Sequence, residues 1–268
     1  MGSASATVLV VRPRAQAAAW VRELAALGVA ARALPLIEIV PVRDQAQVDE
    51  AFAEVESAAG EPLLVFVSPN AVLGFFQCVG SVRLVQARAV AWPAHLRAAA
   101  TGPGTVAALR DCGVPAERIA APPVDAAQFD SEALWSTISG WSWAARRVLI
   151  VRGNGGRDWL GQQLRDAGAD VRVIQSYARE APVLSAAERA LLDAAVADPV
   201  RWIWMFSSSE AIDHLQALAP DAHWDAGRAL ASHPRIAERA RALGFGSVTM
   251  VSPSAAAVAA ALAETPGH

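Results

Sequence analysis

The residues best suited to bind an anion lie in the stretch VLIVRGNGGRDWL, which runs from Val148 to Leu160. An apolar run is followed there by a glycine-rich loop and then by the predicted start of a helix. Free backbone N–H groups at the start of a helix bind carboxylates as well as phosphates. Arg152 and Arg157 flank the loop, so we predict an anion site with these two arginines as ligands.

A nucleotide is not the predicted ligand of this loop. The dinucleotide fingerprint requires the pattern G-x-G-x-x-G, but the loop has Gly153, Gly155 and Gly156, and then Asp158 where the last glycine belongs. The sequence also contains no lysine, which excludes a Walker-type phosphate lysine and a pyridoxal-phosphate attachment. A plain strand-to-helix turn, with Asp158 stabilising the helix dipole, is the structural alternative.

Hydroxyl side chains follow three other predicted strands, in the turns SPN, TGPGT and SSS. Capping of the next helix would explain each of them, because Ser, Thr and Asn are good N-caps. The carboxyl ends of parallel strands are, however, also where open sheets bind ligands. The candidate binding residues from these turns are Ser68, Asn70, Gly102, Thr105, Ser207 and Ser208. No G-x-S-x-G elbow is present, so a serine hydrolase is not predicted.

Tyr177 is the only tyrosine in the chain, and it is predicted to close the strand that follows the Arg152 turn. Its phenol group could donate a proton near the same site. The structural alternative is a core tyrosine whose hydroxyl group is satisfied. Ile37, which occupies the corresponding place in the first half of the chain, favours this alternative because it is apolar.

These residues depend on an alternation of apolar runs and amphipathic stretches, which predicts βαβ units with parallel sheets covered by helices on both faces. Strands are predicted at Val8–Val11, Ala31–Leu36, Leu63–Val67, Arg97–Thr101, Ile119–Ala121, Val148–Val151, Val171–Ile174, Trp202–Phe206, Ala229–Ser232 and Val248–Val251. Predicted helices include Ala15–Leu27, Asn70–Cys78, Gly104–Cys112, Asp158–Ala167, Ser209–Ala217 and Pro234–Leu243.

The second half of the chain repeats the first half at a constant offset in the numbering. VLVVRP begins at Val8 and VLIVRG at Val148, and VFVSPNAV from Val65 corresponds to MFSSSEAI from Met205 at the same offset. Farther on the offset becomes smaller, so that IAAPP from Ile119 corresponds to MVSPS from Met250. We predict two related α/β lobes, joined between the repeats at Ser136–Arg147, with a ligand cleft between the lobes.

The composition is that of a globular protein with a full core. Of 268 residues, 54% are hydrophobic and 18% are charged, and the formal net charge of −3 comes with no basic run for nucleic acid. The five histidines and two cysteines have no metal-ligand spacing, so no metal site is predicted. No apolar stretch is long enough to span a membrane, and the cysteine usage fits a reducing compartment. We expect a soluble cytoplasmic protein.

In their order and spacing, these motifs resemble the uroporphyrinogen-III synthase family over nearly the whole chain. The motifs are V-L-V-x-R-P (Val8–Pro13), L-x-x-x-G (Leu24–Gly28), F-V-S-P-N-A-V (Phe66–Val72), G-P-G-T (Gly102–Thr105), F-D-S-E-A-L (Phe129–Leu134), V-L-I-V-R-G-N-G-G-R-x-x-L (Val148–Leu160), the strand around Tyr177 and F-S-S-S-E-A-I (Phe206–Ile212).

The resemblance implies two Rossmann-like or flavodoxin-like α/β lobes with parallel sheets, joined by a two-stranded β linker, with a cleft between the lobes. The lobes would then differ from the sequence repeats. The first lobe would comprise the ranges 1–38 and 178–268, and the second lobe the range 39–177. The linker strands would lie near 37–42 and 174–180.

The resemblance also implies a cofactor-independent lyase of tetrapyrrole biosynthesis, the route to heme, siroheme and cobalamin. Separately, we expect the protein to be a monomer. Its substrate would be hydroxymethylbilane, a linear tetrapyrrole with acetate and propionate side chains, which loses water and closes to uroporphyrinogen III with ring D inverted. Tyr177 would donate a proton to the departing hydroxyl group, since phenols are protonated at neutral pH. Thr105 matches the threonine of the family and would bind a carboxylate, as would Arg12, Arg152 and Arg157.

One motif departs from the family pattern. Where the family has a second G-P-x-T turn, this sequence has HPRI, so Ile236 replaces the threonine and Arg235 is a candidate carboxylate ligand in its place. Two other functions would use the same cleft. A non-catalytic two-lobed protein that binds an anionic metabolite needs no acid at Tyr177, and a nucleotide-dependent enzyme is disfavoured by the missing glycine and lysine.

Overall fold

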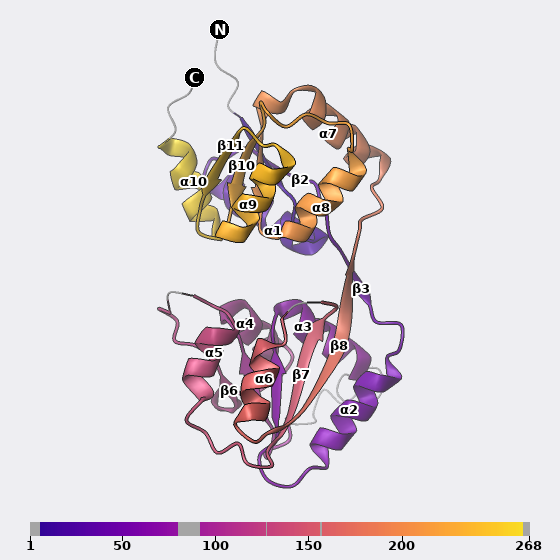
Figure 1. Cartoon of the computed structure of the whole chain (residues 1–268), viewed down its shortest axis with the longest axis vertical. Coiled ribbons are helices and arrows are strands. Elements are labelled where there is room, and N and C mark those ends of the chain that lie inside the picture. The colour runs from indigo at the N-terminus through magenta and orange to yellow at the C-terminus, as the bar shows by residue number, and fades with distance from the viewer. Residues whose placement is uncertain (1–5, 80–91, 127, 156, 265–268) are drawn as a thin grey trace. The chain divides into compact units, whose positions relative to one another are not determined.

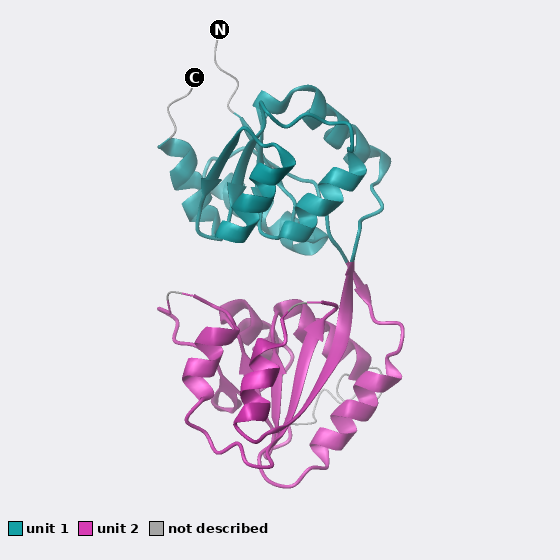
Figure 2. Cartoon of the chain, viewed as in Figure 1, with its two compact units in different colours: residues 1–38, 180–268 teal, residues 39–179 magenta. Residues whose placement is uncertain are grey.

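The computed structural model describes residues 6–79, 92–126, 128–155 and 157–264. The chain divides into two compact units (Figure 2), in which residues 1–38 and 180–268 form unit 1 and residues 39–179 form unit 2. Each unit is a β-sheet flanked by helices (Figure 1). The predicted α/β class with parallel sheets is confirmed. Gly156 of the predicted glycine loop lies outside the described residues.

Unit 1 has a five-stranded sheet in the order β11-β10-β9-β1-β2, and all four pairings are parallel. Its strands are β1 (Thr7–Val10), β2 (Ala31–Ala33), β9 (Trp202–Phe206), β10 (Arg228–Ala231) and β11 (Ser247–Met250). Its helices are α1 (Arg14–Ala26), α7 (Ala186–Ala197), α8 (Ser209–Leu218), α9 (Pro234–Leu243) and α10 (Ala255–Ala263), with a 3-10 turn at Pro199–Arg201. Strands β1 and β9 are continuous apolar runs because helices cover both faces of the sheet.

Unit 2 has a six-stranded sheet in the order β3-β8-β7-β4-β5-β6, in which β4 to β8 pair in parallel. Its strands are β3 (Glu38–Pro41), β4 (Leu63–Phe66), β5 (Arg97–Ala100), β6 (Ile119–Ala120), β7 (Arg147–Gly153) and β8 (Asp170–Glu180). Its helices are α2 (Ala46–Glu56), α3 (Pro69–Val79), α4 (Pro103–Asp111), α5 (Ser131–Ile138) and α6 (Trp159–Asp166), with a 3-10 turn at Ala116–Arg118.

Alternate residues along the strands of unit 2 feed two separate cores. Leu64 and Phe66 of β4 pack with side chains of α2, α3 and α4, and Leu63 and Val65 pack with side chains of α5 and α6. This alternation arises because successive side chains of a strand point to opposite faces. Tyr177 belongs to the first of these cores, which places it on the same face of the sheet as α3.

Strand β8 is longer than predicted. It was predicted to end at Ile174, which would put Tyr177 at the strand end, but it continues to Glu180. The second half lacks a continuous apolar run, and it stays extended because β3 lies beside it and supplies backbone hydrogen-bond partners. Tyr177 therefore lies within a strand, and its backbone is paired with Gly153 of β7.

The strand registers reproduce the internal repeat. Val8 of β1 pairs with Ile203 of β9, and their counterparts in the repeat, Val148 of β7 and Leu63 of β4, also pair with each other. Each unit therefore combines the first strands of one repeat with the last strands of the other. At the end of the repeat the predicted correspondence of Ile119 with Met250 is wrong. Val248 occupies the place of Ile119, since a 3-10 turn precedes β6.

A close helix–strand contact fixes the segment of β8 that carries Tyr177. A Cβ atom on Gly74 of α3 would overlap the backbone oxygen of Ser176, so only glycine fits there. The hydroxyl group of Ser176 is fully buried and donates to the backbone oxygen of Ala71 at 2.9 Å. Helix α3 and the middle of β8 are thus held as one block, which orients the neighbouring tyrosine.

Candidate functional site

Each sheet has a point at which the strand order reverses, and the predicted site residues lie at these points. In unit 2 the chain proceeds outward from β4 through β5 to β6, and in the opposite direction from β7 to β8. Open parallel sheets bind ligands at the carboxyl ends of the strands beside such a reversal. Ser68 follows β4 and Arg152 is the residue before the last of β7, so both lie at this edge. In unit 1, Ser208 and Arg12 hold the equivalent places after β9 and β1.

The hydroxyl group of Tyr177 is directed to the start of helix α3. The side chain is 3% exposed, and its Oη atom lies 3.2 Å from Oγ of Ser68. Oγ of Ser68 also accepts from the backbone N–H of Ala71 at 3.1 Å, which is the predicted capping role. Capping and contact with the tyrosine are thus combined in one serine. The prediction of a core tyrosine is correct for the ring, which packs in the core of unit 2. The hydroxyl group, in contrast, lies next to the Oγ atom of Ser68 at the edge of the sheet.

Gly153, at the end of β7, lies directly under the tyrosine ring. A Cβ atom at this position would be 2.6 Å from Cζ of Tyr177, closer than real Cβ atoms approach. This explains one glycine of the predicted anion loop without any phosphate. It also adds Gly153 to the residues that position the tyrosine, a role that the one-dimensional motif did not indicate.

The turn after β5 contains Gly102 and Thr105, which were predicted to bind a carboxylate. Gly102 is extended and precedes α4, and a Cβ atom there would lie 2.9 Å from Cβ of Phe129. Phe129 itself is 43% exposed and covers this turn. Thr105 is only 2% exposed, and Thr101 donates its hydroxyl group to the backbone oxygen of Val67 at 3.1 Å. Phe129 therefore lines the turn that contains Gly102. The F-D-S-E-A-L motif is the sequence signal that could have identified it.

Arg12 and Arg152 occupy equivalent positions in the two repeats and share one property. Each has a buried Nε atom with no hydrogen-bond partner among the residues that the structure describes. The guanidinium group of Arg12 stacks on Trp20 at 4.4 Å, and burial lowers its pKa. Arg152 donates from Nη1 to the backbone oxygen of Arg157 at 3.3 Å. Buried donors are nearly always satisfied, so two orphans at matching places point to an acceptor from a ligand.

Arg157 differs from these two arginines, because it already has an anionic partner. Its guanidinium group lies 2.8 Å from the carboxylate of Glu132 in the first turn of α5. Both side chains are largely solvent-accessible, so the pair is weak by itself. The predicted carboxylate-binding role of Arg157 would therefore have to compete with, or be shared with, the carboxylate of Glu132.

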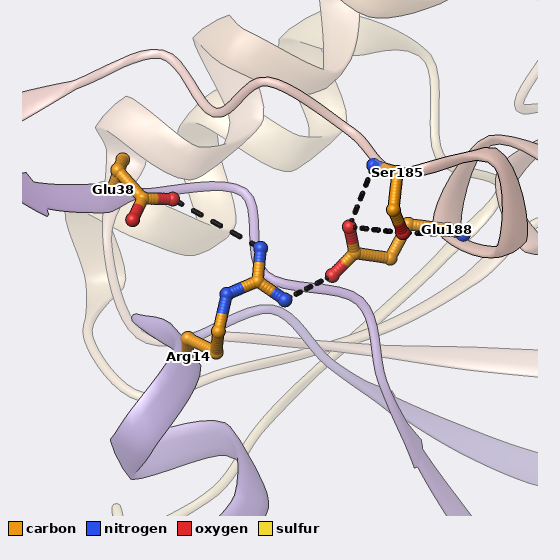
Figure 3. A network of polar contacts seen from close by, with 4 residues as sticks. All are labelled: Arg14, Glu38, Ser185 and Glu188. Atoms are coloured by element: carbon orange, nitrogen blue, oxygen red, sulfur yellow. Dashed lines mark hydrogen bonds and ion pairs between the residues drawn. The ribbon is translucent and has the colours of Figure 1, made fainter.

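Arg14, two positions after Arg12, is engaged within unit 1 (Figure 3). It binds the carboxylate of Glu188 and lies 4.0 Å from that of Glu38, at the start of β3. Glu188 also accepts from the backbone N–H and the hydroxyl group of Ser185, so it completes a capping box at the start of α7. These contacts connect the starts of α1, β3 and α7. Arg12 is then the arginine of this turn that has a hydrogen-bond donor without a partner among the described residues.

The charge of Glu188 should contribute to stability in a pH-dependent way. The hydrogen bond from Arg14 is the main cause that lowers the pKa of Glu188 to about 2. We expect Glu188→Gln to reduce the free energy of unfolding by about 0.5–1 kcal/mol at neutral pH, as for a single ion pair. Glutamine can still cap the helix, so the loss isolates the charge.

The sign of the pH effect follows from the lowered pKa. The contribution is fully present above the ordinary carboxyl range near pH 4.5 and is lost as the pH falls toward 2. Urea unfolding of wild type and variant should therefore give a difference that closes between about pH 4.5 and pH 2. Glu238→Gln, at an exposed position on α9, is the matched control and should show no such difference. A difference that persists at the lowest pH would contradict the assignment.

The serine turn in unit 1 is built for capping. Ser208 caps α8 by accepting from the backbone N–H of Glu210 at 3.2 Å, and Ser207 is half-buried beside it. The hydroxyl group of Ser209 is buried and has no partner among the described residues. In unit 2, Asn70, which corresponds to Glu210, is half-buried in the first turn of α3. Both serine turns thus combine a capped helix with polar atoms at the sheet edge.

The HPRI motif, which replaces the G-P-x-T turn of the family, also caps a helix. Nδ1 of His233 accepts from the backbone N–H of Arg235 at 3.2 Å at the start of α9. Ile236 is buried in the core, where Thr105 is buried in unit 2, so the apolar replacement is a packing residue. The side chain of Arg235 is exposed.

Other chemistries receive no support from the described residues. Burial raises the pKa of the Cys78 and Cys112 thiols, which makes them poorer nucleophiles, and the two are not joined in a disulfide. No group of three or more His, Cys, Asp or Glu residues in the described parts of the chain could hold a metal ion. Within the same parts, no helix combines the length and apolar character needed to cross a membrane.

Comparison with known proteins gives a consistent result. The sequence profile of the family described as "Uroporphyrinogen-III synthase HemD" matches residues 18–260. The uroporphyrinogen-III synthase of Salmonella typhimurium is 30% identical over 257 residues, covering 90% of this chain and 93% of that protein. The Escherichia coli protein of the same name is 31% identical over 252 residues, with the same coverage.

Solved structures agree on the fold. The uroporphyrinogen-III synthetase of Helicobacter pylori superposes with a TM-score of 0.58 at 15% identity, covering 96% of this chain and 98% of that one. A mutant uroporphyrinogen III synthase of Thermus thermophilus gives a TM-score of 0.55 at 14% identity, covering 94% and 96%. At these identities the structures support the two-lobed α/β architecture, and the sequence matches carry the relationship.

Proposed function

Since this chain belongs to the uroporphyrinogen-III synthase family, we propose that the strand-end turns of its two units bind the carboxylates of hydroxymethylbilane and that Tyr177 is the proton donor of the reaction. The chain is a cyclising lyase of tetrapyrrole synthesis with a small-molecule tetrapyrrole substrate. The assignment of roles to individual residues is our proposal.

The observation that carries the proposal is the pair of buried, unpartnered Nε atoms on Arg12 and Arg152. Both arginines lie at the carboxyl end of equivalent strands, one in each unit: Arg12 just beyond β1 and Arg152 next to the last residue of β7. A carboxylate accepts two parallel hydrogen bonds from a guanidinium group, and it would satisfy these donors. A substrate that carries acetate and propionate groups along its length offers several such acceptors.

Tyr177 supplies the acid in this scheme. The C–O bond of the terminal hydroxymethyl group breaks, the proton of the phenol goes to the departing oxygen, and water leaves. The last pyrrole ring attacks the carbon so exposed through the ring carbon that already carries the bridge to the third ring. That bridge bond then breaks, and the released bridging carbon bonds to the free α-carbon of the last ring, which inverts the ring. The proton lost from that α-carbon returns to the tyrosinate, so the phenol is restored. Ser68 positions the phenol, because its Oγ atom is 3.2 Å from the tyrosine Oη and is itself fixed by the backbone N–H of Ala71. Holding the chain of four rings in one reactive geometry supplies a large part of the barrier reduction.

The proposal is tested with freshly generated hydroxymethylbilane and analysis of the product isomers. The expected product is the type III isomer, with no nucleotide or metal added. Spontaneous closure gives the type I isomer, in which ring D is not inverted. Type I alone, together with tight binding of the linear tetrapyrrole, would favour the alternative of a non-catalytic binding protein.

Loss of either orphan arginine should weaken substrate binding. Each charge-assisted hydrogen bond contributes roughly 1.5–3 kcal/mol. We therefore expect Arg152→Gln or Arg12→Gln to raise KM by about 10- to 100-fold, with a smaller effect on kcat. Arg147→Gln is the matched control on the opposite end of the same strand and should leave KM unchanged. An unaltered KM in both Arg12→Gln and Arg152→Gln would refute the carboxylate role.

We also propose that the enzyme acts in the cytoplasm as a monomer, without nucleic acid or membrane partners. The support is compositional. The net charge is −3 with no basic run, and the two cysteines are not paired, which suits a reducing compartment. Sedimentation of the purified chain at micromolar concentration should give the mass of one chain.

A further inference from the structure

A cavity lies at the amino ends of the strands in unit 2, the edge of the sheet opposite to Ser68 and Tyr177. Its volume is about 460 Å³, which is within the range of small-molecule sites. Two arginines contribute to its wall, Arg97 as the first residue of β5 and Arg146 just before β7. The mechanism proposed above uses none of these residues.

The charges of this cavity do not cancel. The guanidinium groups of Arg97 and Arg146 lie 4.8 and 5.1 Å from the ring centre of Trp141, so both are held against one indole. Among the described residues, the carboxylate paired with them is that of Glu61, 3.2 Å from Arg146 and 4.0 Å from Arg97. Two cations with one anion leave the wall positive. Burial lowers the pKa of Arg146, and the charge of Arg97 adds to that effect.

Arg97 also has an unused donor. Its Nε atom is buried and has no hydrogen-bond partner among the residues that the structure describes. Such an atom needs an acceptor, because a buried N–H without one costs free energy. Glu61, with a side chain 54% exposed, is at the edge of the cavity.

Arg97, Arg146 and Trp141 could have a purely structural role, which would be to cover this edge of the sheet. Unit 1 fulfils that role with a simpler arrangement. There Arg228, which corresponds to Arg97 in the repeat, donates to the backbone oxygen of Val200 at 2.7 Å. In unit 2, Trp141 and Arg146 come from the segment that joins the two repeats, which occurs once in the chain. Ala145 in this segment has a φ of 58°, an unfavourable conformation for a residue other than glycine.

We propose that this cavity binds a small molecule bearing an oxyanion, a carboxylate or a phosphate, between the guanidinium groups of Arg97 and Arg146, with Trp141 as one wall. The oxyanion accepts from the buried Nε of Arg97 and displaces Glu61 from Arg146. Bidentate contacts from two arginines are the usual way in which proteins hold such groups.

Calorimetric titration of the full chain tests this site. Inorganic pyrophosphate and citrate are the probes, each compared with sodium chloride at equal ionic strength, and the stronger of the two identifies phosphate or carboxylate as the preferred group. We expect saturable binding that Arg97→Gln and Arg146→Gln each weaken by at least about tenfold. Glu61→Gln should tighten binding about threefold, because it removes the competing carboxylate. Arg228→Gln, at the position of unit 1 that corresponds to Arg97, is the matched control and should leave binding unchanged.

Three outcomes would overturn the proposal. The first is a heat no larger than that of sodium chloride for both probes. The second is binding that survives Arg97→Gln but is lost in Arg152→Gln, which would place the anion at the strand-end turns. The third is an affinity in Glu61→Gln that is unchanged or weaker. This third measurement decides the matter if circular dichroism shows that Arg146→Gln does not fold. The isomer assay is independent of all three results.

Discussion

Tyr177→Phe is expected to lower the rate of type III formation by about 10²–10⁴-fold, the range of general acid catalysis. The reason is that this change removes only the hydroxyl group. The ring, which is buried in the core of unit 2 and packs on Gly153, is retained. Stability should therefore change little, while the departing oxygen loses its proton donor. Single-turnover kinetics with fresh hydroxymethylbilane, followed by separation of the isomers, measures the effect.

A shift of the remaining product toward type I should accompany the slower rate, because spontaneous closure competes with the impaired enzyme. Ser68→Ala serves as the comparison, since it removes the 3.2 Å contact to the tyrosine hydroxyl and leaves the hydroxyl in place. Its rate should fall by about tenfold, and its stability by about 1 kcal/mol through loss of the helix cap. A wild-type rate in Tyr177→Phe would remove Tyr177 from the mechanism.

The elements that depend on local signals could be predicted from the sequence. Trp202–Phe206 is strand β9 and extends as far as its apolar run, and Pro234–Leu243 is helix α9, between a capping residue and Gly244 in the left-handed region. The constant offset of the repeat predicted which residues are equivalent, and the pairs of β1 with β9 and of β7 with β4 follow it. Each of these features depends only on residues that are close together in the sequence, or on the comparison of two segments of the sequence.

Features that depend on contacts between distant segments could not be predicted in this way. The continuation of β8 to Glu180 requires β3 as a neighbour, and the apolar pattern of the β8 residues does not indicate it. The expectation of a linker strand near 174–180 came from the family resemblance. The ion pair of Arg157 with Glu132 depends on how α5 packs next to the glycine loop. The positive cavity at Trp141 depends on side chains from β5 and from the join between the repeats. Each of these is tertiary structure that overrides a local pattern.

The glycine loop illustrates how a motif can suggest the wrong ligand for a sound physical reason. Glycines between a strand and a helix are expected where a phosphate approaches the backbone. Here Gly153 is required by an aromatic ring instead, and Gly155 has a φ of 74°, which favours glycine for the turn alone. Approach of a phosphate to the backbone and contact with an aromatic ring both require glycine, so the two cannot be told apart in the sequence. Only the position of Tyr177 on the adjacent strand distinguishes them.

Gly153→Ala provides the sharpest test of that contact. The new Cβ atom would lie 2.6 Å from Cζ and 2.9 Å from Cε2 of Tyr177, so the ring has to move. The ring is buried among α3 and strand residues that resist such a shift. We expect a loss of about 1–3 kcal/mol in the free energy of unfolding, as for an overpacked core. We also expect a fall in type III formation of about 100-fold or more, because the hydroxyl group leaves Ser68.

Combining this change with Tyr177→Phe separates positioning from general damage. If Gly153 acts through the tyrosine hydroxyl, the double variant should be scarcely slower than Tyr177→Phe alone, and the two effects should be strongly non-additive. Fully additive losses would mean that the methyl group harms the site by another route. Gly140→Ala, at a position with open space around the added atom, is the matched control and should keep both stability and rate. A normal rate in Gly153→Ala would show that the ring can move without loss of function, and the geometry assigned to the acid would then be wrong.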